Sequence, residues 1–356
     1  MTASKNTKKL TFEGEKLFIG IDTHKKNWKV CIHNQLMFLK KFSMNPNPTE
    51  LLSFLNRNYP GGNYFSVYEA GFCGFHIHRK LVSLGINNII VNPADVPTTY
   101  KEKNQKSDPI DCNKLSRELK NNSLTGIYIP DINLESLRSL GRYRKQVYKR
   151  STQIKCRIKS LLNFVGIATP KDIVSQYWSK NYINWLKKTE FESSNYRMIL
   201  DNHIEDFEYN RVKKLSLLRK IRKEFRETEI CKYLTSVPGI GLLSAFIIYS
   251  ELLDIKRFKK LDYIASFIGL IPSTKSSGEK EVSIGITIRC VKEIRRIMIQ
   301  AAWVAVRVDP ALTLAFIELT KRMPKQKAII KVARKLLNRI RYVWLNKTTY
   351  ELGTIE

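Results

Sequence analysis

The sequence is short of acidic residues. Its 356 residues include 32 Asp and Glu against 62 Lys and Arg, which leaves a formal net charge of +30 and a sequence pI of about 9.9. Residues 1–130, 131–230 and 231–356 carry about +8, +10 and +12 respectively, so the excess is not one basic tail. A basic excess spread over the whole chain predicts an extended polyanion as partner, with nucleic acid a better candidate than an acidic membrane surface.

Long apolar runs are also missing. The longest, LLSAFIIYSELL at 242–253, is well short of the ~20 residues that a membrane-spanning helix needs. The N-terminal stretch MTASKNTKKLTFEGEK has no apolar segment typical of a secretion signal. These absences predict a cytoplasmic protein that has no membrane partner.

Cysteine and histidine are sparse. The six cysteines form no C-x-x-C pair and the five histidines show no metal-ligand spacing, which argues against a disulfide framework or a zinc site and favours reduced thiols.

Glycine-rich phosphate loops are absent where an actin-like ATPase would need them, although such a protein could also end its first strand in Gly-Ile-Asp.

Residues 17–130 alternate between strand-like and helix-like segments. The pattern predicts three consecutive strands (LFIGID, NWKVCIHN, LMFLKKFS), then a helix (PTELLSFLNRN), a strand (YFSVYEA), a helix (FHIHRKLVSLG), a strand (NNIIVNP), a helix (DPIDCNKLSRELKN) and a last short strand (TGIYIP). Three strands followed by this alternation are the order of an α/β ribonuclease-H-like (RuvC-like) domain, which we assign to residues 1–130.

Residues 131–230 carry almost no strand signal. Apolar residues at helical spacing predict one long helix through 134–165 and another over roughly 196–230, as in an antiparallel or dimerising coiled coil. Between Arg138 and Lys159 there are nine Lys or Arg and no acid. Ordinary surface helices interleave the two signs, so this run, which includes Arg142, Arg144 and Lys145, favours a helix that faces nucleic acid or a partner over a merely solvated one.

Residues 231–356 form a third, mostly helical region with a break near 270–285. It opens with YLTSVPGIGLLSAF, in which Gly239 and Gly241 lie in a turn between two helical patterns. Such a turn resembles a helix-hairpin-helix, whose glycines let the backbone approach phosphate. Ordinary packing between two helices would use the same turn, so both interpretations stay open.

Four acids fall where one cluster could form. Asp22 ends the first predicted strand, Glu69 ends the fourth, and Asp108 and Asp111 open the helix after the fifth. Neighbouring strands would place Asp22 beside Glu69, and residues i and i+3 share a helix face. Taken singly, each acid could be a helix cap, a turn former or a surface charge. Together they predict a site for Mg²⁺, or Mn²⁺, of the kind that supports phosphoryl transfer.

The motifs GIDTHK, YEA and KSDPIDCNKL, followed by PGIGLLSA, RFKKLDYIASFIGLIPSTKSSGE and IRRIMIQAAW, resemble the DEDD transposases of the IS110 insertion-sequence family. The resemblance runs from about residue 17 to 350. It implies a RuvC-like N-terminal domain, a helical middle and a C-terminal transposase domain that bears a serine. It implies further that Asp22, Glu69, Asp108 and Asp111 bind magnesium, and that the protein acts on element-end and target DNA.

The resemblance also implies a nucleophile and an RNA. A serine beside the glycine of KSSGE would join covalently to DNA; Ser277 directly precedes Gly278 and is the first candidate, with Ser276 in reserve. Free serine is a poor nucleophile and no base is obvious nearby, so the acid domain would activate it, in the same or another subunit. The family works with a non-coding bridge RNA, and a homo-oligomer, dimer or tetramer, is expected.

One departure from the family pattern follows the serine segment. Where the family has a Gly-Asn pair before its Leu-Arg-Arg, this chain has Cys290-Val291, which puts the activity of this copy in question. The basic residues around that position are candidates for phosphate contact, or else a solvated helix face: Arg289, Lys292, Arg295 and Arg296.

The sequence therefore predicts an insertion-sequence recombinase that cuts and rejoins DNA strands through phosphoserine, guided by a bridge RNA. A Piv-type site-specific DNA invertase would share the acids and the serine. A RuvC-like junction nuclease would use water and metal without a covalent intermediate. A nucleic-acid-binding scaffold that has lost its activity is a further alternative, which the four acids disfavour.

Overall fold

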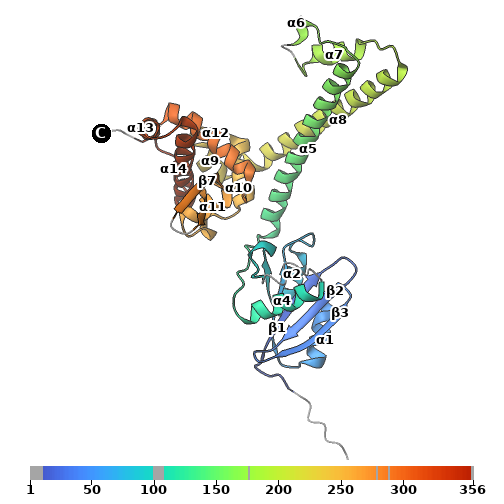
Figure 1. Cartoon of the computed structure of the whole chain (residues 1–356), viewed down its shortest axis with the longest axis vertical. Coiled ribbons are helices and arrows are strands. Elements are labelled where there is room, and N and C mark those ends of the chain that lie inside the picture. The colour runs from blue at the N-terminus through green and yellow to red at the C-terminus, as the bar shows by residue number, and fades with distance from the viewer. Residues whose placement is uncertain (1–10, 99–107, 175–176, 278–279, 288, 354–356) are drawn as a thin grey trace, which may run out of the picture. The chain divides into compact units, whose positions relative to one another are not determined.

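A computed structural model describes residues 11–98, 108–174, 177–277, 280–287 and 289–353, with the backbone alone described at 108–110, 174, 273–277 and 280–284. The chain divides into two compact units, Met1–Ile129 (unit 1) and Pro130–Glu356 (unit 2) (Figure 1). Our division of the sequence into three parts, at 130 and 230, stays a prediction.

Unit 1 is a mixed α/β structure. Its elements are β1 (Lys16–Thr23), β2 (Trp28–His33), β3 (Phe38–Met44), α1 (Pro48–Asn58), β4 (Asn63–Glu69), α2 (His76–Ser83), β5 (Asn87–Val91), the 3₁₀ turn η1 (Pro93–Asp95) and α4 (Asp108–Lys120). The five strands form one sheet in the order β3-β2-β1-β4-β5. The pairs β3–β2 and β2–β1 are antiparallel, whereas β1–β4 and β4–β5 are parallel.

The sheet of unit 1 is covered on both faces. Side chains of a strand alternate between faces, and in β1 Leu17, Ile19 and Ile21 pack into one apolar core with residues of α1 and α2 such as Leu51 and Leu81. The other face receives α4, whose Leu115 packs with strand residues including Val67. The predicted order of strands and helices is confirmed up to residue 120, and so is the adjacency of β1 and β4.

The last predicted strand of unit 1 is wrong. Residues 123–130 form no strand. They contact the edge of the sheet through a hydrogen bond from Ile127 N to Ile90 O, at 2.7 Å. Ile127 and Ile129 are half-buried against the core. The apolar alternation of the segment therefore reports packing against the unit rather than a regular ladder of backbone hydrogen bonds.

Unit 2 is mostly helical. Its elements are α5 (Ile132–Phe164), α6 (Lys171–Val174), α7 (Lys180–Lys188), α8 (Ser194–Phe225), α9 (Glu229–Thr235), α10 (Leu242–Leu252), η2 (Ile255–Arg257), α11 (Leu261–Ile268), β6 (Pro272–Ser277), β7 (Lys280–Ile286), α12 (Lys292–Val308), α13 (Pro310–Thr320) and α14 (Lys325–Asn346). The strands β6 and β7 form an antiparallel pair of their own.

The two longest helices, α5 and α8, pack against each other as the periodicity predicts. α5 begins where the Asp131 carboxylate accepts hydrogen bonds from the amides of Asn133 and Leu134, at 2.8 and 2.9 Å, an arrangement that favours helix initiation. Its distal half shares a separate apolar core with α7 and α8, built from residues such as Ile158, Tyr182 and Ile204. We call this the arm core.

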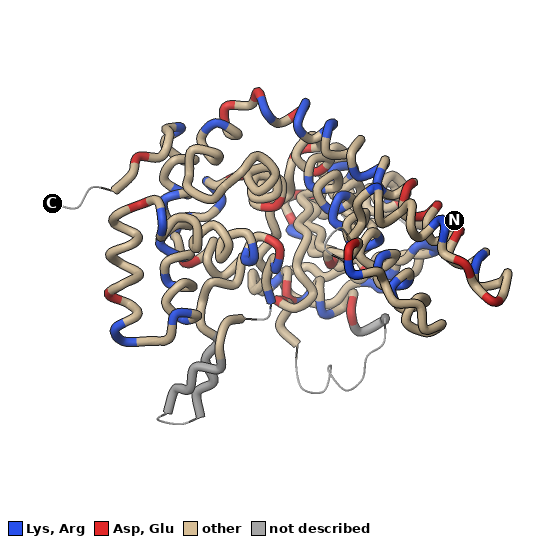
Figure 2. Tube along the Cα trace, turned by 90° about the horizontal axis from the view of Figure 1, so that it is seen from above, with Lys and Arg blue, Asp and Glu red and all other residues tan. Residues whose placement is uncertain are grey.

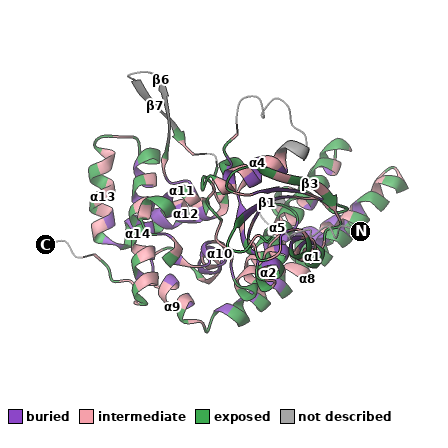
Figure 3. Cartoon of the chain, turned by 90° about the horizontal axis from the view of Figure 1, so that it is seen from below, coloured by how far each residue is buried: buried purple, intermediate pink, exposed green. Residues whose placement is uncertain are grey.

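The larger core of unit 2 is built from helices α9 through α14 together with the proximal parts of α5 and α8. In Figure 3 its buried positions line α10, α12 and α14. At the junction of α12 and α13 the fully buried carboxylate of Asp309 accepts hydrogen bonds from Tyr350 Oη at 2.5 Å, Arg339 Nη1 at 2.6 Å and Leu312 N at 2.8 Å. This network holds the chain after α14 against the core.

Lys and Arg recur along the helices of both units rather than in one segment (Figure 2). Within the described ranges, no helix combines the length and apolar character required to cross a bilayer.

Candidate functional site

Two of the predicted acids lie at the ends of neighbouring strands. β1 and β4 run parallel with Ile21 opposite Tyr68, so the next residue on each strand is an acid, Asp22 on β1 and Glu69 on β4. The Asp22 side chain is 21% exposed, and its Oδ2 lies 3.0 Å from His24 Nε2. The predicted pairing of Asp22 with Glu69 at one edge of the sheet thus agrees with the strand register.

Helix α4 crosses β1 at a glycine, just below that edge. A Cβ atom on Gly20 would overlap the carbonyl oxygen of Cys112 and lie 2.6 Å from Ser116 N, so only glycine permits this approach. Ser116 Oγ also bonds to His33 Nδ1 of β2 at 2.9 Å. The pKa of the Cys112 thiol is lowered mainly by a hydrogen bond with Cys31, while the charge of Asp22 acts to raise it, which places Asp22 within electrostatic reach of this turn of α4.

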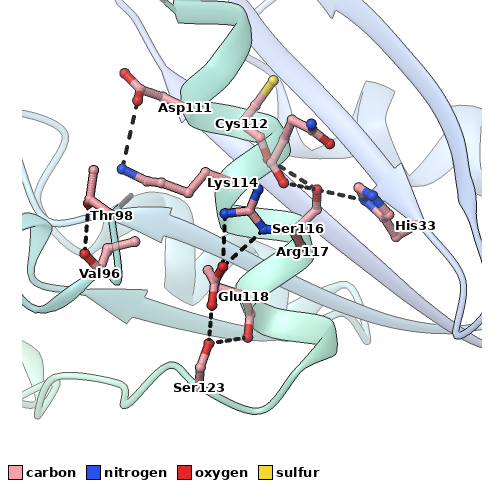
Figure 4. A network of polar contacts seen from close by, with 11 residues as sticks. His33, Val96, Thr98, Asp111, Cys112, Lys114, Ser116, Arg117, Glu118 and Ser123 are labelled. Atoms are coloured by element: carbon pink, nitrogen blue, oxygen red, sulfur yellow. Dashed lines mark hydrogen bonds and ion pairs between the residues drawn. The ribbon is translucent and has the colours of Figure 1, made fainter. Parts of the chain in front are cut away.

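The third predicted acid occupies the same turn. Asp111 precedes Cys112, and its Oδ1 lies 3.8 Å from the ammonium group of Lys114, which is itself only 8% exposed (Figure 4). A buried lysine costs free energy unless a negative group lies near it. The ammonium group of Lys114 and the carboxylate of Asp111 therefore stabilise each other at this end of α4. The side chain of Asp108 lies outside the described residues; its backbone starts α4.

The donor set suits a hard divalent cation, but the described side chains do not yet form a complete cage. Asp22, Glu69 and Asp111 offer carboxylate oxygens, which Mg²⁺ prefers. Among the described residues, no three His, Cys, Asp or Glu side chains converge closely enough to hold one ion. The arrangement therefore brings the acids to one region of unit 1 by strand register and helix crossing, without a closed coordination shell.

A pocket of about 440 Å³ adjoins this edge. Its aromatic and basic lining residues are His24, Lys25, Trp28, Phe72, His76 and Lys80, and Cys73 and two prolines also line it. Phe72 is 64% exposed, and an exposed aromatic ring beside cations suits a nucleotide, since bases stack on rings and cations attract phosphates. The sequence interpretation missed this pocket; the short H-x₃-K spacing of His76 and Lys80 on α2 was its one visible sign.

The serine segment is a β-hairpin, not the loop that its polar composition predicted. In the β6–β7 pair Ser276 lies opposite Glu281 and Ser277 opposite Lys280, so Ser277 ends β6 at the tip of the hairpin. Gly278 and the side chains of both serines lie outside the described residues. β6 resembles a loop in sequence because PSTKSS shows no apolar face, whereas in β7 Val282, Ile284 and Ile286 recur at every second position, a strand signal that the sequence interpretation missed.

The base of the hairpin is tied to α12. Arg295 Nη1 donates hydrogen bonds to the carbonyl oxygens of Thr287, at 2.8 Å, and Gly269, at 3.4 Å. Gly269 has φ +77°, and a Cβ atom there would lie 2.6 Å from Cys290 Cβ. Cys290, the departure from the family pattern, therefore packs against the glycine that ends α11. Arg295 links α12 to the base of the hairpin, and its phosphate contact stays a prediction.

The two glycines of the P-G-I-G turn have different roles. Gly239 has φ +80°, and a Cβ atom there would lie 2.7 Å from the backbone of Ala301; the turn thus packs directly on α12. Gly241 is the N-cap residue of α10, and nothing lies within 4 Å of where its Cβ would be. Packing alone explains Gly239, whereas Gly241 stays available for a close approach to phosphate.

The acid-free basic run of α5 finds its acids on other helices. Arg142 Nε lies 3.0 Å from Glu251 Oε1 of α10, and this hydrogen bond raises the pKa of the Arg142 guanidinium. Arg144 and Lys145 both pair with Glu293 of α12, at 3.4 and 3.5 Å. The three predicted nucleic-acid-binding residues of α5 are thus ion-paired within unit 2. Glu251 and Glu293 lie more than 100 residues away in sequence, so no local pattern indicated these pairs.

The remaining basic candidates cluster near the start of α12. Arg289, Lys292 and Arg296 are exposed, and the latter two lie within one helical turn of each other. Lys292 and Arg296 lie on the same side of unit 2 as Arg144 and Lys145, because these four residues line one pocket.

Comparison with known proteins agrees with these features. Residues 19–167 match the model of the DEDD transposase family of IS110, and residues 231–317 match that of the IS116/IS110/IS902 transposase family. Together the two matches cover roughly two thirds of the chain. The first holds the acids and the second the serine hairpin.

Curated relatives are similar over large parts of their lengths. The chain is 28% identical over 303 residues to y4rJ of Sinorhizobium fredii, named as a transposase, covering 78% of this chain and 76% of that protein. It is 26% identical over 240 residues to y4qE of the same organism, also named as a transposase, covering 67% of this chain and 58% of y4qE.

A third relative is the transposase for insertion sequence element IS1111A of Coxiella burnetii, which is 24% identical over 245 residues, covering 66% of this chain and 64% of that protein. The chain thus spans less than two thirds of the length of two of these relatives. The two family matches, at residues 19–167 and 231–317, show that the chain carries transposase domains of the IS110 insertion-sequence family.

Proposed function

We propose that the protein is a DNA recombinase of an insertion sequence that cuts and rejoins strands through a serine nucleophile and a metal-binding acid site. The observation that carries the proposal is the meeting of β1 and β4: their register sets Asp22 beside Glu69, and the Gly20 crossing brings the Asp111 turn of α4 to the same region. Unit 1 is accordingly a ribonuclease-H-like domain.

The acid site supplies the electrostatics of the reaction. Asp22, Glu69, Asp108 and Asp111 would hold Mg²⁺, and the ion, when bound, would supply positive charge to polarise the scissile phosphate and stabilise the leaving oxygen. Lys114 keeps Asp111 oriented and offsets part of the repulsion among the acids before substrate binds. His24, hydrogen-bonded to Asp22, restrains that carboxylate.

Ser277 is the proposed nucleophile. Its oxygen forms a bond to the phosphorus of the scissile phosphodiester as the bond to one deoxyribose oxygen breaks; the serine proton is released and the leaving oxygen is protonated. A second exchange with a strand hydroxyl reverses the bonding and frees the serine, so both steps balance without a redox partner. The end of β6 suits this role, because a two-stranded β-ribbon can enter the major groove of a duplex.

A non-coding bridge RNA is the proposed guide, and a dimer or tetramer is the proposed assembly. The basic excess over both units is consistent with more than one polyanion. A Piv-type invertase would perform the same chemistry without an RNA. A junction nuclease would cut with activated water, and Ser277 would then be structural.

The decisive experiment is a covalent-adduct assay. Purified protein, Mg²⁺, labelled DNA from the ends of the element and the transcript that flanks the gene are mixed and resolved on a denaturing gel. We expect an adduct that Ser277→Ala and Asp22→Ala abolish and that Ser276→Ala retains. Cut DNA without an adduct, unchanged by either serine substitution, would leave the junction nuclease as the better description.

An RNA-free arm of the same assay separates recombinase from invertase. We expect adduct formation on the element ends to fall at least tenfold when the transcript is left out or replaced by a scrambled RNA of equal length. Equal yields with and without the transcript would favour the invertase.

A further inference from the structure

Unit 2 contains a basic pocket of about 510 Å³ between α5 and the first turns of α12. Its lining residues are Arg144, Lys145, Tyr148, Lys149 and Thr152 of α5 with Lys292, Glu293 and Arg296 of α12. Five cations face one carboxylate, so the pocket keeps a positive charge of about four even after the ion pairs of Glu293 are counted. The two helices that build it are far apart in sequence.

Arg144 is the buried charged residue of this pocket. Its residue is only 8% exposed, its guanidinium carbon lies 4.4 Å from the centroid of the Tyr148 ring, and Nη1 reaches Glu293 at 3.4 Å. Within the described part of the chain, Arg144 Nε is buried without a hydrogen-bond acceptor. A buried guanidinium donor that lacks an acceptor costs free energy, which an incoming anion would recover.

The start of α12 adds to the attraction for an anion. This helix of 17 residues begins at Lys292, and the N-cap residue Val291 offers no side-chain acceptor to its first amides. The positive end of a helix dipole is thus directed to the same region. Glu293, the acid of the first turn, is already bound by Arg144 and Lys145.

The pocket is part of the body that carries the serine hairpin. β7 ends at Ile286, α12 begins at Lys292, and Arg295 of α12 holds the carbonyl of Thr287 between them. An anion fixed by Lys292 and Arg296 would therefore be positioned relative to the base of the hairpin by a single helix.

We propose that this pocket binds a backbone phosphate of the polynucleotide on which the protein acts, and so sets the register of that strand relative to the serine hairpin. The inference rests on the proposed function. A phosphodiester fits better than a base because the Tyr148 ring already lies beside two cations, Arg144 and Lys214, the latter at 5.2 Å. Arginine and lysine donors bind phosphate oxygens without regard to sequence, so the contact positions the strand and does not read it.

The test compares two charge-matched double variants. Lys292→Glu with Arg296→Glu reverses two exposed cations of the pocket; Lys232→Glu with Lys256→Glu reverses two exposed cations on α9 and η2, outside it. Each protein is titrated against labelled element-end duplex and, separately, against the flanking RNA transcript at several salt concentrations.

We expect the pocket variant to lose at least about tenfold in affinity for one of the two polymers, with the salt slope reduced by about one to two. The matched control should lose no more than about threefold. The polymer that is affected, DNA or RNA, identifies the source of the phosphate. Equal losses in both variants would overturn the pocket, because they would reflect net charge alone.

Lysine acylation with mass spectrometry gives an independent readout on the wild-type protein. Lys145, Lys149 and Lys292 should be protected by bound polynucleotide while Lys232 and Lys256 stay reactive; uniform reactivity would overturn the proposal. The adduct assay keeps the two proposals distinguishable. Protection without any adduct means that the serine chemistry fails and the pocket stands, whereas an adduct formed normally by the pocket variant means that the pocket fails alone.

Discussion

Gly20 of β1 and Cys112 of α4 meet without space for a single methyl group between them. Gly20→Ala must therefore push α4 off the sheet or strain both backbones. We expect a loss of about 1–3 kcal/mol in the free energy of unfolding, together with reduced strand cleavage because the Asp111 turn moves from Asp22.

Urea unfolding and the adduct assay measure the two effects of Gly20→Ala. Gly126→Ala is the control, since its Cβ would make ordinary contacts with Ile89 at 3.4 Å. Equal stability of the two variants would contradict the tight crossing.

The glycines of the P-G-I-G turn should separate stability from binding. Gly239→Ala forces an alanine into a left-handed conformation against the Ala301 backbone and should cost at least about 1–2 kcal/mol in the free energy of unfolding. Gly241→Ala should cost less, about 0.5–1 kcal/mol, because its surroundings are open and only the preference of the α10 N-cap for glycine over alanine is lost. If Gly241 approaches phosphate, Gly241→Ala weakens DNA binding several-fold in anisotropy titrations; unchanged affinity would leave the turn with a packing role only.

Arg295 and its neighbour Arg296 should respond in opposite ways. Arg295→Gln removes a charged donor to the Thr287 and Gly269 carbonyls, so the free energy of unfolding should fall by about 1.5–3 kcal/mol with little change in the salt slope of nucleic-acid binding. Arg296→Gln should leave stability within about 0.5 kcal/mol of the wild type and reduce that slope. The anchor role fails if Arg295→Gln alters the slope and not the stability.

Asp309 predicts an acid-sensitive C-terminal core. Burial by itself raises the pKa of this carboxyl, but hydrogen bonds from Tyr350, Leu312 N and Gly353 N, with the charge of Arg339, lower it overall. A lowered folded-state pKa contributes stability above the unfolded value of about 3.9 and loses it as pH falls through the folded pKa.

Urea unfolding between pH 7 and pH 3 tests the role of Asp309. The stability gap between wild type and Asp309→Asn should be constant above about pH 5 and should shrink toward pH 3. The exposed acid Asp172, changed to Asn, should show no comparable gap. A gap that stays constant down to pH 3 would mean that the carboxylate charge contributes nothing.

Metal removal should stop chemistry and spare binding. With excess EDTA we expect at least a hundredfold loss of adduct, restored by Mg²⁺, and the same loss in Glu69→Gln with Mg²⁺ present, because each change removes the cation from the scissile phosphate. Glu15→Gln, an exposed acid at the opposite end of β1, is the matched control. Full adduct yield in EDTA would rule out the acid site as a metal site.

Local periodicity was enough to predict the strands and helices whose buried residues recur at regular spacing in the sequence. The alternating residues of β1 and the helically spaced apolar residues of α5 and α8 all pack into apolar cores, so their patterns could be read directly from the sequence. β6 could not be, because its Ser, Thr and Lys residues show no apolar face; β7 does alternate apolar residues, at Val282, Ile284 and Ile286.

The site was predictable in part for the same reason. The adjacency of Asp22 and Glu69 follows from the strand order, which the sequence indicated. The pairing of Glu293 with Arg144 could not be inferred, since it joins helices whose contact depends on the tertiary packing of unit 2. An acid-free run of nine cations was interpreted as a binding face, although the acids that neutralise part of it come from α10 and α12.

α5 belongs to two cores, one shared with α10 and α12 and the other with α7 and α8. Each residue of a helix turns its axis by about 100° and advances it by about 1.5 Å. One inserted residue between the two cores would rotate the distal half of α5 by more than a quarter turn. Its arm-core residues would then move away from their partners on α8. Evolution can therefore lengthen this arm only in steps close to whole helical turns, made in both helices together.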